Sequence, residues 1–486
     1  MHDPDIGWAD SCGLPPVEVP ELCVRDIVDA TGGRLLFGDE TLPLQRLVTD
    51  SRRIESGDVF WALESERDNG SRFAAGAVRS GAQGVVVSQS TESWSARPAF
   101  AVRVDSGRRA LGQLARFVRA RQAAKIIGIT GTCGKTSTKA LAAAALEGER
   151  RTVAAWKSFN NDLGVPWTLL RLRHHTEACV LEIGTNAPGE IAHLAGIARP
   201  DIAVVLNIGP GHLHGLRDLA GVCREKGDLV ATLGREGVAI LNADDPCFEE
   251  LAARAPGRVV PFGEGPAAEL RAESIALSVD RVRFRCRGVS VEVPFGGRHQ
   301  VANALAALAI AEAVGVPIER AAEGLAHCRP IEGRLVPRRL GGLWVLDDVY
   351  NANPLSMAAA LETLKRFPAA SRKVAILGDM LELGDDAERY HEELGERAMR
   401  AADGVIAVGT HREAIASGVA RAGGLAESFE SVEALCSNLP TILEGSDVVL
   451  VKASRAAGFE RVVAAIRRQL EPGAKGVVTE GGHHVV

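Results

Sequence analysis

The sequence lacks the features that mark several common classes of protein. It has no apolar run of about 18 residues, which predicts that no segment spans a membrane. The N-terminal residues do not show the pattern of a signal peptide. The net charge is −6, so a broad basic surface for nucleic acid is not expected. An anionic ligand would therefore have to be held by local features of the chain.

Cysteine is present, but not in the spacing of a structural site. The nine cysteines are odd in number and scattered, and no two of them form a CxxC pair. This pattern predicts reduced thiols rather than a disulfide framework or a zinc site. Together with the missing export signal, it predicts a cytoplasmic protein.

The length and the order of apolar segments predict three α/β domains. A chain of 486 residues is too long for one ordinary domain, and we place the domains at residues 1–124, 125–329 and 330–486. In the first, "LVTDSRRIESGDVFWAL" predicts strand, polar turn and strand, and "FAAGAVRSGAQGVVV" predicts helix, glycine turn and strand. About the first 20 and the last 15 residues are expected to be loosely ordered.

The second domain is predicted to contain a parallel sheet. Its apolar, β-branched runs end in Gly, Asn or Asp and alternate with helical patterns, which is typical of strands buried on both faces. A later stretch, "VRFRCRGVSVEVPF", has a period of two and predicts a short antiparallel segment, and "HQVANALAALAIAEAVG" predicts a helix. The expected parallel strands are "KIIGIT", "ACVLEIGTN", "DIAVVLNIG" and "GVAILNADD".

The third domain shows the same alternation on a smaller scale. Apolar strands with polar exits are separated by helical stretches, which predicts a second doubly wound, Rossmann-like sheet. The expected strands are "GGLWVLDD", "RKVAILGDM", "GVIAVG" and "DVVLVKAS".

The first strand of the second domain runs into a glycine-rich loop, "GTCGKTS", at residues 131–137. It is a shortened P-loop, because Ile129 stands where the full pattern has its first glycine. The glycines let backbone N–H groups form an anion nest, and the following helix adds its N-terminal dipole. Lys135 would add charge for the β- and γ-phosphates, and the Thr136 hydroxyl could hold Mg²⁺. The alternative is an ordinary glycine turn with a surface lysine, but the position between an apolar strand and a helix favours phosphate.

Polar residues also follow other strands of this domain. Glu182 lies near the exit of the next apolar strand, and His212 and His214 lie just past another. Ligands collect beyond the carboxyl ends of parallel strands, so we expect the loop, Glu182 and His212 to meet, with Mg²⁺ ligands among them. A lone histidine is more often structural, and these two are two residues apart, so we expect only one to face the site.

Taken together, these segments resemble the Mur ligase superfamily, and within it the branch that adds D-alanyl-D-alanine to UDP-N-acetylmuramoyl-tripeptide. The resemblance runs in order from about Leu47 to Ser454, and "YNANP" and "GDMLELG" are typical of that branch. The segments that carry it are "GTCGKTS", "FNNDLGVPWTLL", "LEIGTNAPGEIAHL", "LNIGPGHLHG", "REKGDL", "LNADD", "DDVYNANPLSM" and "LGDMLELG".

The resemblance implies an ATP-dependent, ADP-forming amide ligase of peptidoglycan precursor synthesis, monomeric and acting on small molecules. The γ-phosphoryl group of ATP would pass to a carboxylate of the UDP-linked substrate, and the amine of the dipeptide would then displace phosphate. The first domain would bind the UDP-sugar, and the central P-loop ATPase-like domain would bind ATP. The Rossmann-like domain would complete the site.

The resemblance also implies roles for individual residues. Thr136 and Glu182 would hold one Mg²⁺, and His212 would serve a second. Lys226, in "REKGDL", matches a lysine that CO₂ carbamylates, which turns a cation into an anionic metal ligand. Phosphates would be held by Lys135 with Gly131, Thr132, Cys133, Gly134, Thr136 and Ser137. The other implied residues are Asn160, Asn161 and Asp162 near the γ-phosphate and acyl group, Asn303 at adenine, Arg334 and Asp348 at phosphate and ribose with Tyr350, Asn351 and Asn353 beside them, and Thr49, Asp50, Ser51 and Arg52 at the UDP-sugar.

One segment of the first domain departs from the pattern of this branch. Ser65 and residues 69–71 in "LESERDNGSRF" differ from the residues expected there, which leaves recognition of the UDP-sugar open but not that of ATP. A sibling ligase with a different acyl or amine substrate is therefore an alternative. A non-catalytic nucleotide-binding protein is a further alternative, and the presence of Lys135, Glu182, His212 and Lys226 together argues against it.

Overall fold

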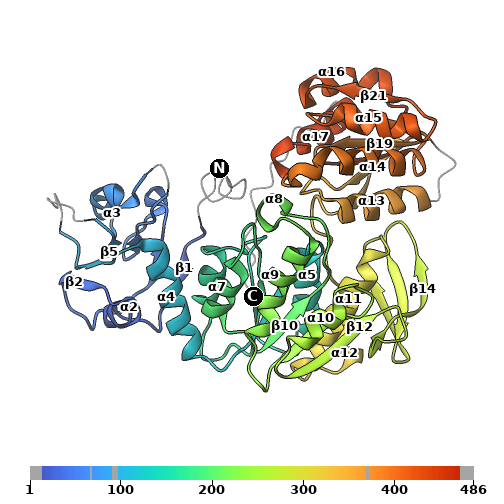
Figure 1. Cartoon of the computed structure of the whole chain (residues 1–486). Coiled ribbons are helices and arrows are strands. Elements are labelled where there is room, and N and C mark those ends of the chain that lie inside the picture. Colours follow the sequence, from blue (N-terminus) through green and yellow to red (C-terminus); the bar gives the residue numbers. More distant parts are fainter. Residues whose placement is uncertain (1–13, 66–67, 90–96, 368–371, 471–486) are drawn as a thin grey trace.

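The computed structural model describes residues 14–65, 68–89, 97–367 and 372–470. Figure 1 shows three successive α/β units: an N-terminal unit in blue, a central unit in green and yellow, and a C-terminal unit in orange and red. The predicted α/β class is confirmed, whereas the positions of the domain boundaries stay a prediction. Among the described helices, none is long and apolar enough to cross a membrane.

The N-terminal unit is a six-stranded sheet with antiparallel edges. Its inner strands are parallel, and its helices are α2 (Val24–Thr31), α3 (Ala74–Arg79) and α4 (Gly107–Ala120), with short turns η1 (Ser51–Arg53) and η2 (Gly70–Phe73). The strand order is β1 (Val17–Glu18), β3 (Arg46–Val48), β4 (Val59–Trp61), β5 (Gly84–Val87), β6 (Phe100–Arg103) and β2 (Arg34–Phe37), and the two edge strands run antiparallel to their neighbours.

The start of the described chain is better ordered than its sequence predicts. Val17 and Val19 are buried, and β1 pairs with β3. The indole Nε1 of Trp167 in the central unit donates a hydrogen bond to the Pro15 carbonyl at 2.6 Å. The expectation of loose order is therefore wrong for residues 14–20, because alternate apolar side chains bury against a sheet. Residues 1–13 and 471–486, where loose order was also expected, lie outside the described residues.

The central unit contains the predicted parallel sheet. Strand β7 (Lys125–Thr130) lies between two parallel partners, and its residues from Ile126 onward are buried, as a strand covered on both faces requires. The full order is β13 (Leu270–Arg271), β12 (Arg258–Gly263), β11 (Val238–Asn242), β10 (Ile202–Val205), β7, β9 (Ala178–Glu182) and β8 (Thr152–Ala154).

Helices and a small second sheet complete the central unit. The predicted antiparallel segment is present, and a third strand that was not predicted adds to it: β14 (Glu273–Leu277), β15 (Val282–Cys286) and β16 (Val289–Val293). The helices are α5 (Lys135–Leu146), α6 (Gly164–Leu169), α7 (Glu190–Ala198), α8 (Leu213–Leu216), α9 (Leu219–Ala231), α10 (Phe248–Ala253), α11 (His299–Ala313) and α12 (Ile318–Ala326).

The C-terminal unit is the second doubly wound sheet that the sequence predicts. Its order is β17 (Val336–Leu340), β18 (Leu343–Asp347), β22 (Val448–Lys452), β19 (Lys373–Gly378), β20 (Gly404–Val408) and β21 (Ala426–Phe429), parallel except for β17. Both edge strands were missed, because "VPRRL" and "AESF" have no continuous apolar run. The helices are α13 (Pro354–Arg366), α14 (Ala387–Met399), α15 (Arg412–Arg421), α16 (Val432–Ile442) and α17 (Glu460–Leu470), with turns η3 (Gly384–Asp386) and η4 (Arg455–Ala457).

A buried histidine makes the C-terminal unit sensitive to acid. His391 is fully buried, its Nδ1 donates to the Ala387 carbonyl at 2.7 Å, and its Nε2 accepts from the Met380 N–H at 2.8 Å. Burial lowers its pKa from 6.5 to about 4, and His411 stacked on it acts in the same direction. His391, His411 and Asp379 are close together, but both ring nitrogens of His391 are occupied, so the cluster is not a ready-made metal site.

Replacing His391 with Gln should make stability less dependent on pH. Below pH 6.5 the unfolded chain binds a proton that the folded chain refuses, so this group should destabilise the folded state by about 2 kcal/mol between pH 7 and pH 5. Urea unfolding followed by circular dichroism at both pH values measures this loss. His391→Gln should lose less unfolding free energy on acidification than the wild type or His175→Gln, which changes an exposed histidine. Equal losses in all three proteins would contradict the assignment.

Candidate active site

The glycine-rich loop lies between β7 and α5, with the backbone geometry of an anion cradle. Gly134 has a φ of 86°, and a Cβ there would lie 2.4 Å from Oδ1 of Asn303, so only glycine fits. Helix α5 begins at Lys135, directly after the loop, and the Lys135 Nζ donates to the Gly131 carbonyl at 2.7 Å. The loop therefore offers backbone donors, a positive helix end and a cation to a negatively charged ligand.

The loop lines a cavity of about 460 Å³ to which the central and C-terminal units both contribute. Glu182 and His212 line the same cavity, as expected from their positions after parallel strands, whereas His214 is exposed and is not part of the lining. The other predicted residues in the lining are Thr132, Cys133, Gly134, Lys135, Thr136, Ser137, Asn160, Asn161, Asp162, Asn303, Arg334, Asp348, Tyr350, Asn351 and Asn353.

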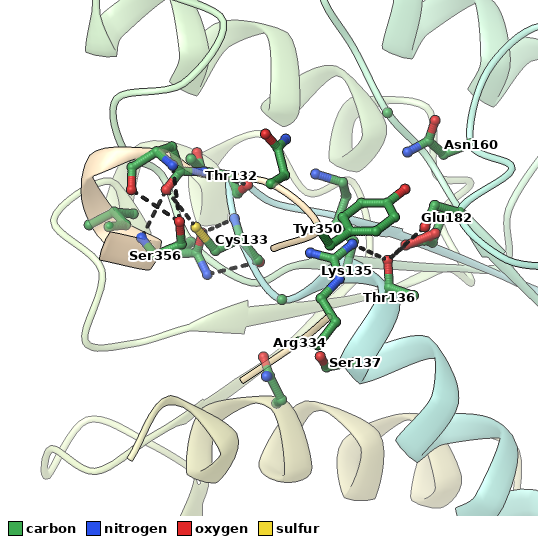
Figure 2. Close-up of a pocket in the computed structure, with 18 of the residues that line it drawn as sticks. Thr132, Cys133, Lys135, Thr136, Ser137, Asn160, Glu182, Arg334, Tyr350 and Ser356 are labelled. Carbon is green, nitrogen blue, oxygen red and sulfur yellow. Dashed lines mark hydrogen bonds between the residues drawn. The ribbon is translucent and has the colours of Figure 1, made fainter. Parts of the chain in front are cut away.

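The Thr136 hydroxyl, in the lining of this cavity, joins the two units (Figure 2). It donates to Oε1 of Glu182 at 2.6 Å and accepts from Nη2 of Arg334 at 3.0 Å. The Arg334 guanidinium carbon lies 3.8 Å from the ring centroid of Tyr350, which is a cation–π contact. The C-terminal unit thus brings an arginine and a tyrosine directly over the loop.

The carboxylate of Glu182 is only partly satisfied by the described residues. Its Oε2 is buried without a hydrogen-bond partner among them, and Nζ of the buried Lys139 lies 3.8 Å away. A buried oxygen of this kind is costly unless something pairs with it. Carboxylate and hydroxyl oxygens are hard ligands that suit Mg²⁺, so Glu182 and Thr136 fit the metal that the sequence predicted. Lys139 was not predicted; it also donates a hydrogen bond to the Lys157 carbonyl.

The imidazole of His212 is held by a residue of the C-terminal unit. Its Nδ1 lies 2.5 Å from Oε2 of Glu382, a contact that sequence reasoning missed. This hydrogen bond holds the pKa of Glu382 below its usual value. With Nδ1 engaged, only Nε2 of His212 could bind a metal.

Lys226 is buried on α9 and does not line the cavity. Burial, followed by the charge of Lys135, lowers its pKa from 10.5 to about 7. Its neighbour Glu225 accepts hydrogen bonds from the N–H groups of Gly189 and Ile191, at 2.7 and 2.8 Å. The amine of Lys226 is therefore substantially neutral near pH 7, which is the form that reacts as a nucleophile.

The buried side chains of Lys452 and Asp348 hold the segment around Tyr350. Lys452, which is 1% exposed, lies with its Nζ 2.7 Å from Oδ2 of Asp348 and donates to the Asn351 carbonyl at 2.7 Å. Sequence reasoning missed Lys452, although its place at the end of β22 could have indicated it. Asn353 caps α13 and accepts a hydrogen bond from Sγ of Cys133 at 3.0 Å, which is a second contact between the loop and this unit.

The residues beside Asn303 form a small polar network on α11. Asn303 Oδ1 accepts from the Thr138 hydroxyl at 3.2 Å, and its Nδ2 donates to Oε1 of Gln300 at 2.9 Å. His299 lines the same end of the cavity, and burial lowers its pKa to about 4. Its Nδ1 is buried without a hydrogen-bond partner among the described residues, so a neutral histidine, missed from the sequence, is available to a ligand.

The segment at residues 160–162 lines the cavity, but two of its side chains also have structural partners. Asn161 Oδ1 accepts from the backbone N–H groups of Leu163 and Gly164, at 3.2 and 3.0 Å, where α6 begins. Asp162 forms an ion pair with Arg108 at 3.1 Å.

The residues predicted to bind the UDP-sugar lie in the N-terminal unit and do not line this cavity. Asp50 caps η1 and forms an ion pair with Arg52 at 2.7 Å. Asn69 accepts from the Ser71 N–H at 2.9 Å and donates to the Ser88 hydroxyl at 3.0 Å. Asn69 and Ser71, which depart from the expected pattern, therefore make local hydrogen bonds.

Comparison with known proteins identifies the family of this chain. Two family models match: the Mur ligase middle domain over residues 129–311, and the Mur ligase, glutamate ligase domain, over residues 333–455. The chain is 36% identical to the UDP-N-acetylmuramoyl-tripeptide--D-alanyl-D-alanine ligase of Escherichia coli (strain K12), over 91% of this chain and 98% of that protein.

Solved structures agree with these matches. MurF from Acinetobacter baumannii is similar with a TM-score of 0.85 and 31% identity, covering 94% of this chain and 99% of that one. MurF ligase from Thermotoga maritima in complex with ADP is similar with a TM-score of 0.78 and 29% identity, covering 88% and 98%. The chain therefore belongs to the Mur ligase family, in its UDP-N-acetylmuramoyl-tripeptide--D-alanyl-D-alanine ligase branch.

Proposed function

We propose that the protein uses ATP to join D-alanyl-D-alanine to UDP-N-acetylmuramoyl-tripeptide, with release of ADP and phosphate, in peptidoglycan precursor synthesis. The observation that carries this proposal is the match to a ligase of that name over 98% of its length. The cavity supports it, because a phosphate-binding loop and an arginine from another unit face the same space. A cytoplasmic location and a monomeric state stay predictions.

The chain's own residues would bind and orient ATP. The loop N–H groups, the start of α5 and Lys135 would hold the β- and γ-phosphates. Asn303 would face adenine, and Asp348 with its neighbours Tyr350 and Asn351 would face the ribose. In this assignment the γ-phosphoryl group would lie toward Thr136, within reach of a carboxylate of the tripeptide.

A metal would be held at the same end of the loop. Thr136 and Glu182 are assigned to one Mg²⁺ and His212 to a second, and bound Mg²⁺ would neutralise charge on the phosphates. Oε2 of Glu182 supports this assignment, because it is buried and accepts no hydrogen bond from the described residues, with Nζ of Lys139 3.8 Å away. Lys226 is assigned as the carbamylated lysine: its neutral Nζ would bond to the carbon of CO₂ and lose one proton, which leaves an anion in a position now occupied by a buried amine.

Arg334 is assigned to the phosphoryl group in transfer. It reaches the Thr136 hydroxyl from the C-terminal unit. The distance between its positive charge and the loop therefore depends on how the two units are placed. A positive charge that is fixed before the reaction and shielded from water stabilises developing negative charge well. The amine of D-alanyl-D-alanine would then attack the acyl phosphate beside Asn160 and Asn161.

A product assay tests the proposed function. Purified protein with ATP, Mg²⁺, UDP-N-acetylmuramoyl-tripeptide and D-alanyl-D-alanine should release phosphate and yield a product heavier by one dipeptide minus water. Lys135→Ala should lower the rate about 100-fold or more with the fold intact, because it removes a charge at the phosphates and not a core contact. Phosphate release and mass spectrometry are the measurements. A protein that binds ATP but makes no product from these substrates would point to a sibling ligase with a different substrate.

The carbamate is tested separately, at Lys226. Lys226→Ala should lose most activity, and a short carboxylic acid such as formate should restore part of it by standing in for the carbamate. Lys365→Ala, at an exposed lysine of α13, is the matched control and should respond to neither change. Wild-type protein in ¹³C-bicarbonate should show a carbamate resonance that Lys226→Ala lacks. An alanine variant as active as the wild type, or the same spectrum in both proteins, would contradict the assignment.

A further inference from the structure

A further contact joins the central and C-terminal units, away from the contacts of the glycine-rich loop with Arg334 and Asn353. It is formed by the loop and short helix after β10 and by the segment that follows β19. His212 Nδ1 lies 2.5 Å from Oε2 of Glu382, and the His214 N–H donates to the Glu382 carbonyl at 3.1 Å. Glu382 thus engages one loop through both its side chain and its backbone.

Apolar packing supports the same contact. Leu213, Leu216 and Val222 form a small buried cluster of the central unit, and Tyr390 on α14 of the C-terminal unit packs against it. The pairing of His212 with Glu382 is therefore part of a docked interface and not an isolated surface ion pair, which would contribute little.

The backbone at both ends of the contact is unusual. His212 has a φ of 55° and Glu382 has a φ of 64°, although neither is glycine. Such conformations cost about 1 kcal/mol or more each and persist where surrounding contacts hold them. Two strained residues facing each other across an interface indicate that the orientation of these two side chains matters.

The chemistry of the pair explains why it would matter. A neutral imidazole that donates from Nδ1 to a carboxylate presents the lone pair of Nε2, and this arrangement fixes the ring of histidines that bind metals. His212 lines the same cavity as the glycine-rich loop and Glu182, which both belong to the central unit. The carboxylate bound to its Nδ1, on Glu382, belongs to the C-terminal unit.

We propose that Glu382 is a positioning residue that orients His212 for metal binding, so that a metal site of the central unit is completed only when the C-terminal unit is docked. This inference rests on the proposed function, in which His212 serves a Mg²⁺. In this proposal Glu382 touches neither ATP nor the metal. It links the docking of the two units to the site where the phosphates would lie.

Metal binding measured directly tests this proposal. Mn²⁺ stands in for Mg²⁺ and can be counted by electron paramagnetic resonance on the full-length protein with ADP present. Glu382→Ala should weaken Mn²⁺ binding about tenfold, the lower end of the effect of removing such a partner. Glu382→Gln, whose amide oxygen can still accept from Nδ1, should recover most of the affinity. Glu388→Ala, at an exposed glutamate of α14, is the matched control and should bind Mn²⁺ like the wild type.

The outcomes separate this proposal from the proposed function. Unchanged or tighter Mn²⁺ binding by folded Glu382→Ala would overturn the positioning role, and so would an equal loss with Gln. If the alanine variant does not fold, Glu382→Asp decides instead, because a carboxylate withdrawn by one methylene should weaken binding several-fold. If the wild-type protein makes no product in the product assay, the proposed function is contradicted but the positioning role of Glu382 is not. Mn²⁺ binding does not depend on the identity of the acyl substrate.

Discussion

The hydrogen bonds of one hydroxyl group, on Thr136, hold the candidate site together. That hydroxyl binds Glu182 on one side and Arg334 on the other, so it joins the end of β9, the start of α5 and the C-terminal unit at a single atom. The loop before it can approach Asn303 only because Gly134 has no side chain. A methyl group at residue 134 would collide with Asn303 and disturb the glycine-rich loop that leads to Thr136.

Three lysines are buried in or near the site, although the chain as a whole is acidic. Lys139, Lys226 and Lys452 are 6%, 2% and 1% exposed. Burying an ammonium group costs several kcal/mol unless an anion compensates it, and here Glu182 and Asp348 compensate two of the three lysines, while the third has a pKa lowered to about 7. Such an arrangement is suited to a polyanionic ligand, which would bring the negative charge that the described residues only partly supply.

Much of the fold and part of the site could be predicted from the sequence. Continuous apolar strands alternating with helices led to the parallel sheets. Glu182, at the end of β9, and His212, beyond β10, line the same cavity as the loop because parallel strands end at one edge. The prediction failed where a fold depends on partners far apart in the chain. Residues 14–20 are ordered by burial against a sheet. Lys452 pairs with Asp348, which lies far from it in the sequence of the same unit, and Glu382 meets His212 only where two units dock.

The account depends most on Arg334, which only the C-terminal unit supplies. A single-turnover measurement of phosphoryl transfer, with ADP affinity determined in parallel, tests it most directly. Arg334→Ala should slow phosphoryl transfer about 100-fold or more while ADP binds nearly as tightly. Arg334→Lys should restore only part of the transfer rate, because lysine lacks the planar fork that reaches Thr136. Transfer at the wild-type rate in Arg334→Ala would contradict the view that two docked units build one active site.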